Sequence, residues 1–400
     1  MFSDSAVAFA VSWARLGGQS VPLAWRSLLA NRRRLVRSSA GIGFAVLLML
    51  VQLGFERGFF EASLATVSAL RGDLFITNAS KYRFGSRDPF PPQDLAAARA
   101  VAGVAGVTPL YGAWQDFFWQ PPGSDQPYLV QAFGFDPAHP PFLLPDVEGE
   151  SARLTAPDTV LGDRDARRFL GMKAAQGDAR INGHLVHIVG GFALGPDFLS
   201  DGTVMMSAAT FAAVASGGRV PASELPVEFG VVTVRPGAKP AQVQRALMAA
   251  LPQGLRVMTK PQLVEFERKF QSDLSSAGPI FWLGTLVGFV VGMLISYQIV
   301  YTDLSDQLPQ YAMLKGMGYE TGYLVRVVMT QAGLSAIAGW LPAWLVGLLV
   351  YWAIGRLALL PMQMTWQITL ISLGLTLAMC LLSAALAIRR VVAADPAEIF

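Results

Sequence analysis

Hydrophobic positions gather in four long stretches that divide the chain unevenly. None of them contains a charged side chain, and they run over Ser38–Phe55, Ala277–Thr302, Val327–Gly355 and about Gln367–Ile388. A helix rises about 1.5 Å per residue, so roughly 20 apolar residues cross about 30 Å of hydrocarbon. We therefore predict four transmembrane helices in a 1+3 arrangement, at residues 38–58, 277–302, 327–355 and 367–388.

The polar block between the first two stretches, residues 59–276, predicts a large α+β domain outside the membrane. Two strand–helix–strand patterns occur in it, at Asp73–Thr77, Gln93–Ala102 and Val107–Trp114, and at Glu228–Val234, Lys239–Ala250 and Leu255–Thr259. Such units pair into one sheet in a split βαβ, or ferredoxin-like, module. We place this porter-like module at about 71–115 and 227–260, close to the membrane, with an inserted β-rich subdomain at about 125–225.

Helical patterns also continue from the spans into the polar block. Glu56–Leu70 extends the first span, and the segment from Gln262 to about Val300 predicts one helix of about 57 Å, at ~1.5 Å per residue. Pro261 suits a helix start, and Pro279 is a candidate kink. The two extensions predict a rigid stalk that carries the outer domain. The alternative is that their charged side chains only keep a linker soluble.

Basic residues near the spans indicate the orientation of the chain. Arginines precede the first span at 15, 26, 32, 33, 34 and 37, and follow the last at 389 and 390. The positive-inside rule then puts both termini in the cytosol, including the tail 389–400. We expect a multi-pass membrane protein whose large domain lies outside the cytoplasmic membrane, in the periplasm if the cell has one.

The N-terminal region, residues 1–37, contains an amphipathic pattern over Val21–Arg37. A helix of this kind, rich in arginine and carrying a tryptophan, lies along the inner membrane surface. The alternative is a basic anchor that only sets the topology. The predicted surface anchor residues are Trp25, Arg32, Arg33, Arg34 and Arg37.

One cytosolic loop, residues 303–326, joins the second and third spans. It predicts a short helix at Tyr311–Lys315, with Pro309 near its start and Gly316 to Gly318 at its end. A short, partly apolar helix without a core of its own suits a groove in a partner protein. An ordinary turn between spans is the alternative.

Glycines recur every fourth residue in the second span, at Gly284, Gly288 and Gly292. A stripe of small residues lets two membrane helices approach closely. We expect packing against Gly41 of the first span or against a second copy of the chain. Alternatively, glycine is simply frequent in membrane helices.

Composition agrees with a membrane protein and excludes several functions. The chain is 53% hydrophobic and 15% charged, whereas soluble domains average about 25% charged residues. Its net charge of +3 resides mostly in the arginine cluster, which gives no support to nucleic-acid binding. The single cysteine, Cys380, lies in the last span, so no disulfide is expected in the outer domain.

We identify no enzyme chemistry in the sequence. A Gly-x-x-x-x-Gly-Lys-Ser/Thr phosphate-binding motif is missing, so ATP hydrolysis would have to come from another chain. His184 and His187 should point to opposite faces of a strand, which disfavours a shared metal site. We expect a non-catalytic subunit with no cofactor, metal or catalytic residue of its own.

Several segments resemble the FtsX-like, MacB-type permeases of ABC transporters. The stretches "AGIGFAVLLMLVQLGFERGFFEASL", "YAMLKGMGY" and "RRVVAADPAEIF" look most like the DevC subgroup. The resemblance spans nearly the whole chain and is strongest at 40–64, 310–331 and 389–400. Two departures are Gln310, where the family often has an acidic residue, and the extension Met1–Ser20.

The resemblance implies a MacB-like fold and the permease subunit of a type VII ABC transporter. Such a subunit forms a homodimer, binds a separate ATPase that holds ATP and Mg, and transmits conformational change across the membrane (mechanotransmission). The DevC type works with a periplasmic membrane-fusion adaptor and a TolC-type outer-membrane channel in efflux of glycolipids or other amphiphiles. The implied ATPase-coupling residues are Pro309, Gln310, Tyr311, Ala312, Met313, Leu314, Lys315, Gly316, Met317 and Gly318.

Two alternatives remain open at the level of sequence. The same fold serves regulators of cell-wall hydrolases and permeases that release lipoproteins. A membrane-bound ligand sensor is a different class, and it would need a cytosolic output domain.

Overall fold

The computed structural model describes residues 32–173, 177–196, 200–274, 277–317, 320–358 and 362–393. These residues divide into two compact units. The helical unit contains the chain up to Glu56, Pro279–Gly355 and the part that begins at Met362, and the outer unit is built on Arg57–Gly278. Each unit is described by itself.

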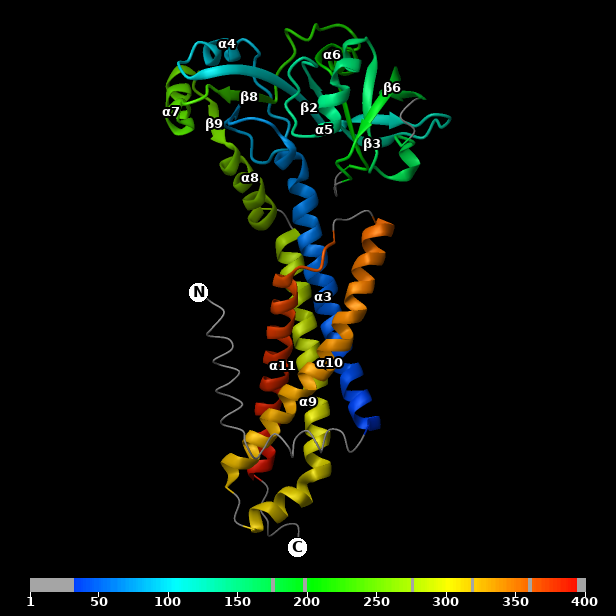
Figure 1. Ribbon diagram of the computed structural model, residues 1–400, viewed down its shortest axis with the longest axis vertical. Coiled ribbons are helices and arrows are strands. Elements are labelled where there is room, and N and C mark those ends of the chain that lie inside the picture. Colours follow the sequence, from blue (N-terminus) through cyan, green and yellow to red (C-terminus); the bar gives the residue numbers. More distant parts are fainter. Residues whose placement is uncertain are drawn as a thin grey trace. The chain divides into compact units, whose positions relative to one another are not determined.

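Within the described residues, four helices are long and apolar enough to cross a membrane. They are α3 (Arg32–Ala69), α9 (Ala277–Gly316), α10 (Thr321–Ala358) and α11 (Trp366–Ala393), with candidate spans at Val36–Ala69, Gly278–Asp306, Gly322–Leu357 and Trp366–Ile388. The predicted 1+3 arrangement is therefore confirmed (Figure 1). Helix α3 runs unbroken through the predicted extension of the first span.

Polar contacts connect the helices of the helical unit. On α10, Trp340 and Trp344 donate their indole N–H groups to Ser372 (3.1 Å) and Thr369 (3.2 Å) of α11. The Tyr351 hydroxyl donates to the backbone carbonyl of Leu50 in α3. Indole and phenol groups within a membrane need such partners because the hydrocarbon contains no water that could form hydrogen bonds with them.

The outer unit begins with a four-stranded antiparallel sheet. Its strands are β1 (Leu74–Asn78), β2 (Val104–Gln120), β8 (Phe229–Val234) and β9 (Leu255–Thr259), in the spatial order β2-β8-β1-β9. The crossover helices are α4 (Asp94–Arg99) and α7 (Pro240–Ala250). This strand order interleaves the two strand–helix–strand halves, as a ferredoxin-like module requires. The predicted α+β class of the outer domain is confirmed.

Alternation along β1 explains how this sheet is covered. Leu74 and Ile76 face one hydrophobic cluster together with Leu95 of α4 and Leu247 of α7. Phe75 faces a second cluster on the opposite side, which also takes in Leu263 of the following helix. Successive side chains of a strand point to opposite faces, so a strand covered on both sides is apolar throughout.

A closed β-barrel forms the inserted subdomain. Strand β2 pairs with β3 and β5, and the ring closes through β3–β7, β7–β4, β4–β6 and β6–β5. The added strands are β3 (Tyr128–Phe135), β4 (Thr159–Asp163), β5 (Gly177–Ile181), β6 (His184–Phe192) and β7 (Thr203–Ser207). Around them lie α5 (Pro145–Glu150), η1 (Ser151–Thr155), η2 (Arg168–Leu170) and α6 (Ala208–Ser216).

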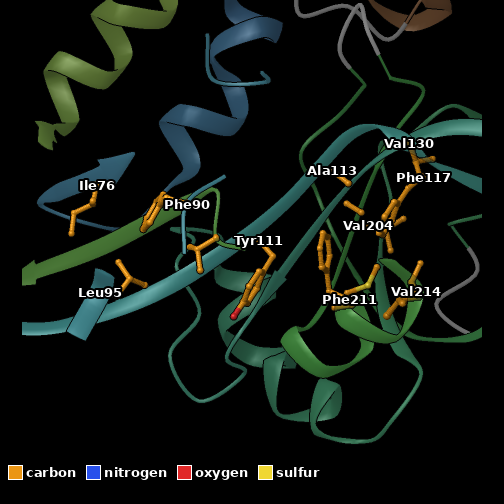
Figure 2. Packing of buried hydrophobic residues seen from close by; sticks show 14 of the residues in the cluster. Ile76, Phe90, Leu95, Tyr111, Ala113, Phe117, Val130, Val204, Phe211 and Val214 are labelled. Atoms are coloured by element: carbon orange, nitrogen blue, oxygen red, sulfur yellow. The ribbon is translucent and has the colours of Figure 1, made fainter. Parts of the chain in front are cut away.

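Strand β2 belongs to both the module and the barrel. It pairs with β8 along Val104–Leu110 and with β3 from Tyr111 onward. Figure 2 shows one hydrophobic cluster that follows this strand from Ile76 and Leu95 to Phe117 and Phe211. The Phe117 and Phe211 rings stack with centroids 5.1 Å apart. Module and barrel therefore share one core and form a single body.

The segment predicted as one helix from Gln262 to Val300 contains α8 (Lys260–Lys269), a π-helical turn, η3 (Phe270–Leu274), and α9, which starts at Ala277. Residues 275 and 276, between the π turn and α9, lie outside the described residues. Pro279 sits in the first turn of α9, where proline is tolerated. Single π turns inside helices often occur at functional positions.

Candidate functional site

The predicted coupling segment lies at the end of α9. The structure corrects the expectation of a separate short helix at Tyr311–Lys315, because α9 continues without a break to Gly316. Met313 and Met317 are each 63% exposed. Gly318 and the side chains of the other predicted coupling residues lie outside the described part of the chain.

Pro309 falls inside this helix rather than at a helix start. Proline has no backbone N–H, so it leaves one carbonyl of the preceding turn without its helical partner. Figure 1 shows the last part of α9 turning away from its upper part. Kinks at proline have this cause, and a kink sends the exposed methionines in a direction of their own.

The glycine stripe of α9 lies against α3 of the same chain. A Cβ added at Gly284 would meet the Gln52 side chain at 2.5 Å, one at Gly288 would meet Met49 at 3.2 Å, and one at Gly292 would meet Ala45 at 2.9 Å. A Cβ on Gly41 would in turn meet Ile295 at 2.9 Å.

Each step along α9 thus matches a step in the opposite direction along α3. The glycines line an antiparallel seam that only small residues permit. Of the two expected neighbours of the stripe, the structure places the first span there. Gln52 adds a hydrogen bond from its side-chain amide to the Phe281 carbonyl (3.2 Å).

Of the predicted surface anchor, only the arginines fall within the described residues. Arg32, Arg33 and Arg34 open α3, and Arg37 follows in its second turn with an exposed side chain. Trp25 and the expected amphipathic helix lie outside the described residues.

The two helical extensions enter the outer sheet at neighbouring strands. Helix α3 leads into β1, and α8 follows directly from β9, while Leu74 and Thr259 are paired across the two strands. Thr259 and Gln262 form a capping box that fixes the start of α8. Lys260 donates from its ammonium group to the carbonyls of Ser68 (2.8 Å) and Leu70 (2.5 Å), at the end of α3. A displacement of either helix therefore acts on adjoining strands.

A second tie joins α8 to the loop that follows β1. Glu267 is 4% exposed, and its carboxylate accepts the backbone N–H of Phe84 at 2.6 Å. Gln271, in the π turn, donates to the other carboxylate oxygen at 2.9 Å. Burial raises the pKa of Glu267, and these two donors act against that rise. The buried Glu267 carboxylate thus fixes the C-terminal end of α8 to the loop after β1.

The same loop is held from the other side by a buried ion pair. Lys81 and Glu228 have side chains 1% and 4% exposed, and their charged atoms lie 2.7 Å apart. The Lys81 ammonium also donates to the Ser86 carbonyl and lies 5.2 and 4.9 Å from the ring centroids of Trp114 and Phe229. Burial lowers the pKa of Lys81 and raises that of Glu228, and the opposite charge of each partner counteracts both shifts.

These buried groups were not among the residues singled out in the sequence. Lys81 lies in a loop of mixed polarity, where nothing local marks it as buried. Glu267 had a weak signal, since it follows Leu263 by four residues and so shares its helix face. That face is the buried one.

The histidines form separate pairs with acids. His184 Nε2 lies 2.7 Å from Asp158, and His187 Nδ1 lies 2.7 Å from Asp178. Across the described residues, no three His, Cys, Asp or Glu side chains are grouped so as to hold a metal ion. The His187–Asp178 contact joins strands β6 and β5, and the His184–Asp158 contact joins β6 to the turn before β4.

Comparison with known proteins places this architecture in a family. A family model described as a MacB-like periplasmic core domain matches residues 38–250, more than half of the 400-residue chain. The chain belongs to the MacB-like permeases. A second model, described as FtsX-like permease C-terminal, matches residues 278–396. This MacB-like permease is therefore an integral membrane protein with a periplasmic domain, and the resemblance noted in the sequence is confirmed at family level.

Solved structures of related domains are distant. The periplasmic region of MacB from Actinobacillus actinomycetemcomitans matches with 10% identity and a TM-score of 0.35, over 49% of this chain and 92% of the other. The extracellular domain of the noncanonic ABC-type transporter YknZ from Gram-positive bacteria matches with 11% identity and a TM-score of 0.32, over 47% of this chain and 99% of the other. A domain of a putative permease from Porphyromonas gingivalis matches with 14% identity and a TM-score of 0.31, over 46% of this chain and 86% of the other. No curated protein sequence matches the chain.

Proposed function

We propose that this MacB-like permease transmits conformational change from a cytosolic ATPase to its periplasmic domain in an ATP-driven export complex. The observation that carries the proposal is the pair of helices that enter adjoining strands of the outer sheet. Helix α3 includes a candidate span and leads into β1, and α8 starts at β9. An input of this kind moves a whole sheet rather than opening a pore.

The proposed partners follow from the family. We infer a homodimer that binds two copies of a separate ABC ATPase through the end of α9. ATP and Mg would be held by that ATPase, since this chain has no phosphate-binding motif. A periplasmic adaptor and, through it, a TolC-type outer-membrane channel complete the proposed tripartite efflux pump. An amphiphilic cargo such as a glycolipid is the substrate class that we propose, from the resemblance to the DevC subgroup.

The coupling contact can be tested with two exposed methionines, Met313 in α9 and Met317 directly after its end. Replacing both Met313 and Met317 with Asp puts charges where an apolar groove is expected to receive them. We expect the reconstituted complex to lose its permease-stimulated ATPase activity, while membrane insertion stays normal. Met248→Asp on α7 is the matched control, because that methionine is 53% exposed in the outer unit. Undiminished ATPase stimulation in the double variant would remove the coupling role of this segment.

A further inference from the structure

A small cavity with a mixed polar and apolar lining lies within the helical unit. Its volume is about 20 Å³, and it is lined by residues of α3, α9 and α10. Ile42 contributes an apolar wall from α3. The polar lining comes from Ser296 and Asp303 on α9 and from Gln331 and Ser335 on α10. Polar groups from two helices therefore converge on one space within the candidate spans.

Ser296 makes this cavity chemically unusual. Its side chain is 1% exposed, and its hydroxyl oxygen has no protein partner with hydrogen-bond geometry. The Cys380 thiol of α11 lies against this hydroxyl, but a thiol is only a weak partner. An unpaired hydroxyl buried from solvent costs about 1–3 kcal/mol by mutational measures, and hydrocarbon offers it nothing. A polar occupant of the cavity would give this hydroxyl a stronger partner than the thiol.

The volume of the cavity limits what it can hold. About 10–15 Å³ of accessible volume holds one water molecule, and a trapped water makes about three hydrogen bonds to buried polar groups. A cavity of about 20 Å³ fits one water and excludes a pair. The hydroxyls of Ser296 and Ser335 and the amide of Gln331 supply both donors and acceptors, as a water requires.

We propose that this cavity binds one ordered water molecule, which bridges Ser296 on α9 to Ser335 and Gln331 on α10. The bridge connects the helix that ends at the exposed methionines to the next span. A water-mediated hydrogen bond is nearly as favourable in enthalpy as a direct one, so the bridge would hold α9 against α10. This inference stands whether or not the chain couples to an ATPase.

Direct observation is the first test. The wild-type complex in lipid nanodiscs should show one density peak within hydrogen-bond distance of the Ser296 hydroxyl and of a polar atom of α10. The peak should persist when sodium salts are replaced by choline salts. No peak would overturn the proposal, and so would a peak that disappears without sodium, which would identify a cation instead.

A double-mutant cycle tests the bridge in solution. Ser296→Ala and Ser335→Ala should each lower the thermal unfolding midpoint of the full chain in detergent. Because either change breaks the same bridge, the double variant should shift the midpoint no further than the larger single shift. Ser305→Ala, an exposed serine of α9, is the control and should leave the midpoint unchanged. Additive shifts of the two single variants would show independent serines and overturn the bridge.

Discussion

At the scale of single residues, the outer unit depends on a few buried charges that fasten one loop. Lys81 and Glu228 hold the loop after β1 from the sheet side, and Glu267 holds it from α8. Buried ion pairs contribute little net stability compared with apolar residues, but the loss of one partner leaves the other charge buried and uncompensated. These contacts fix the position of the loop between α8 and the sheet.

Removing one member of the pair should therefore be costly. Lys81→Met leaves the Glu228 carboxylate buried without its cation, and we expect a loss of about 3–5 kcal/mol in the free energy of unfolding. The double variant Lys81→Met, Glu228→Leu should recover most of this loss, because no charge remains buried. Thermal denaturation of the two variants measures both effects. A double variant no more stable than Lys81→Met would contradict a cost of leaving the Glu228 carboxylate buried alone.

Asp163 gives the outer unit a defined pH dependence. The buried carboxylate accepts backbone N–H groups from Asp165 (3.0 Å), Leu194 (3.1 Å) and Gly195 (2.9 Å). Burial still prevails over these donors and raises its pKa from 3.8 to about 6. The folded state thus binds this proton more tightly than the unfolded chain. Ionised Asp163 costs stability above about pH 6, and the cost, about 3 kcal/mol, disappears as the pH falls to about 4.

The difference in the free energy of unfolding between wild type and Asp163→Asn should depend on pH. Wild type should gain stability relative to the variant as the pH falls from about 6 to about 4, since asparagine does not titrate. Unfolding midpoints of both proteins across this pH range provide the measurement. A difference that does not change with pH would mean that Asp163 keeps its ordinary pKa.

Tertiary position explains why these residues escaped prediction. Both Lys81 and Asp163 acquire their environment from segments far away in the chain, Glu228 and the turn at Leu194–Gly195. Sequence patterns show which residues recur at helical or strand spacing. They do not indicate which distant residue will contact a given side chain in the folded protein. The glycine stripe was predictable because its spacing of four is itself local.

At the scale of elements, α3 and α9 pack closely along the seam that the glycine stripe lines. Gly288→Leu would force a large side chain against Met49, whose nearest atom would already be 3.2 Å from an added Cβ. We expect a loss of about 1–3 kcal/mol from overpacking, seen as a lower unfolding midpoint in detergent. Gly374→Leu is the matched control, because a Cβ at Gly374 in α11 has nothing within 4 Å. Equal midpoints for the two variants would contradict the seam.

Elements with strong local signals could be predicted, and their junctions could not. The strands of the ferredoxin-like module correspond to the predicted ones within a few residues, apart from the long end of β2, because each is a short apolar run between turn residues. The π-helical turn at Phe270–Leu274 had no such signal, since "FQSDL" continues an ordinary helical pattern. The contacts of Glu267 and Gln271 with the loop after β1 occur only in the folded unit. Closure of the barrel through the β2–β3 and β2–β5 pairs likewise depends on distant segments.

At the scale of the whole molecule, we propose a subunit that moves its outer domain through helices. The end of α9 would receive the ATPase, the seam would carry displacement to α3, and adjoining strands β1 and β9 would receive it in the outer sheet. Each of these contacts joins only neighbouring elements. A test of the whole path therefore has to measure movement of the outer domain.

The most direct test is a distance measured between the two copies of a reconstituted complex. A spin label at Glu265→Cys suits it, because that side chain is 68% exposed on α8 and the only native cysteine, Cys380, is buried. We predict that trapping ATP on the partner ATPase shifts the label-to-label distance in wild type and leaves it unchanged in the Met313→Asp, Met317→Asp variant. The same distance with and without ATP, in a complex that hydrolyses ATP normally, would contradict the transmission of movement to the periplasmic domain.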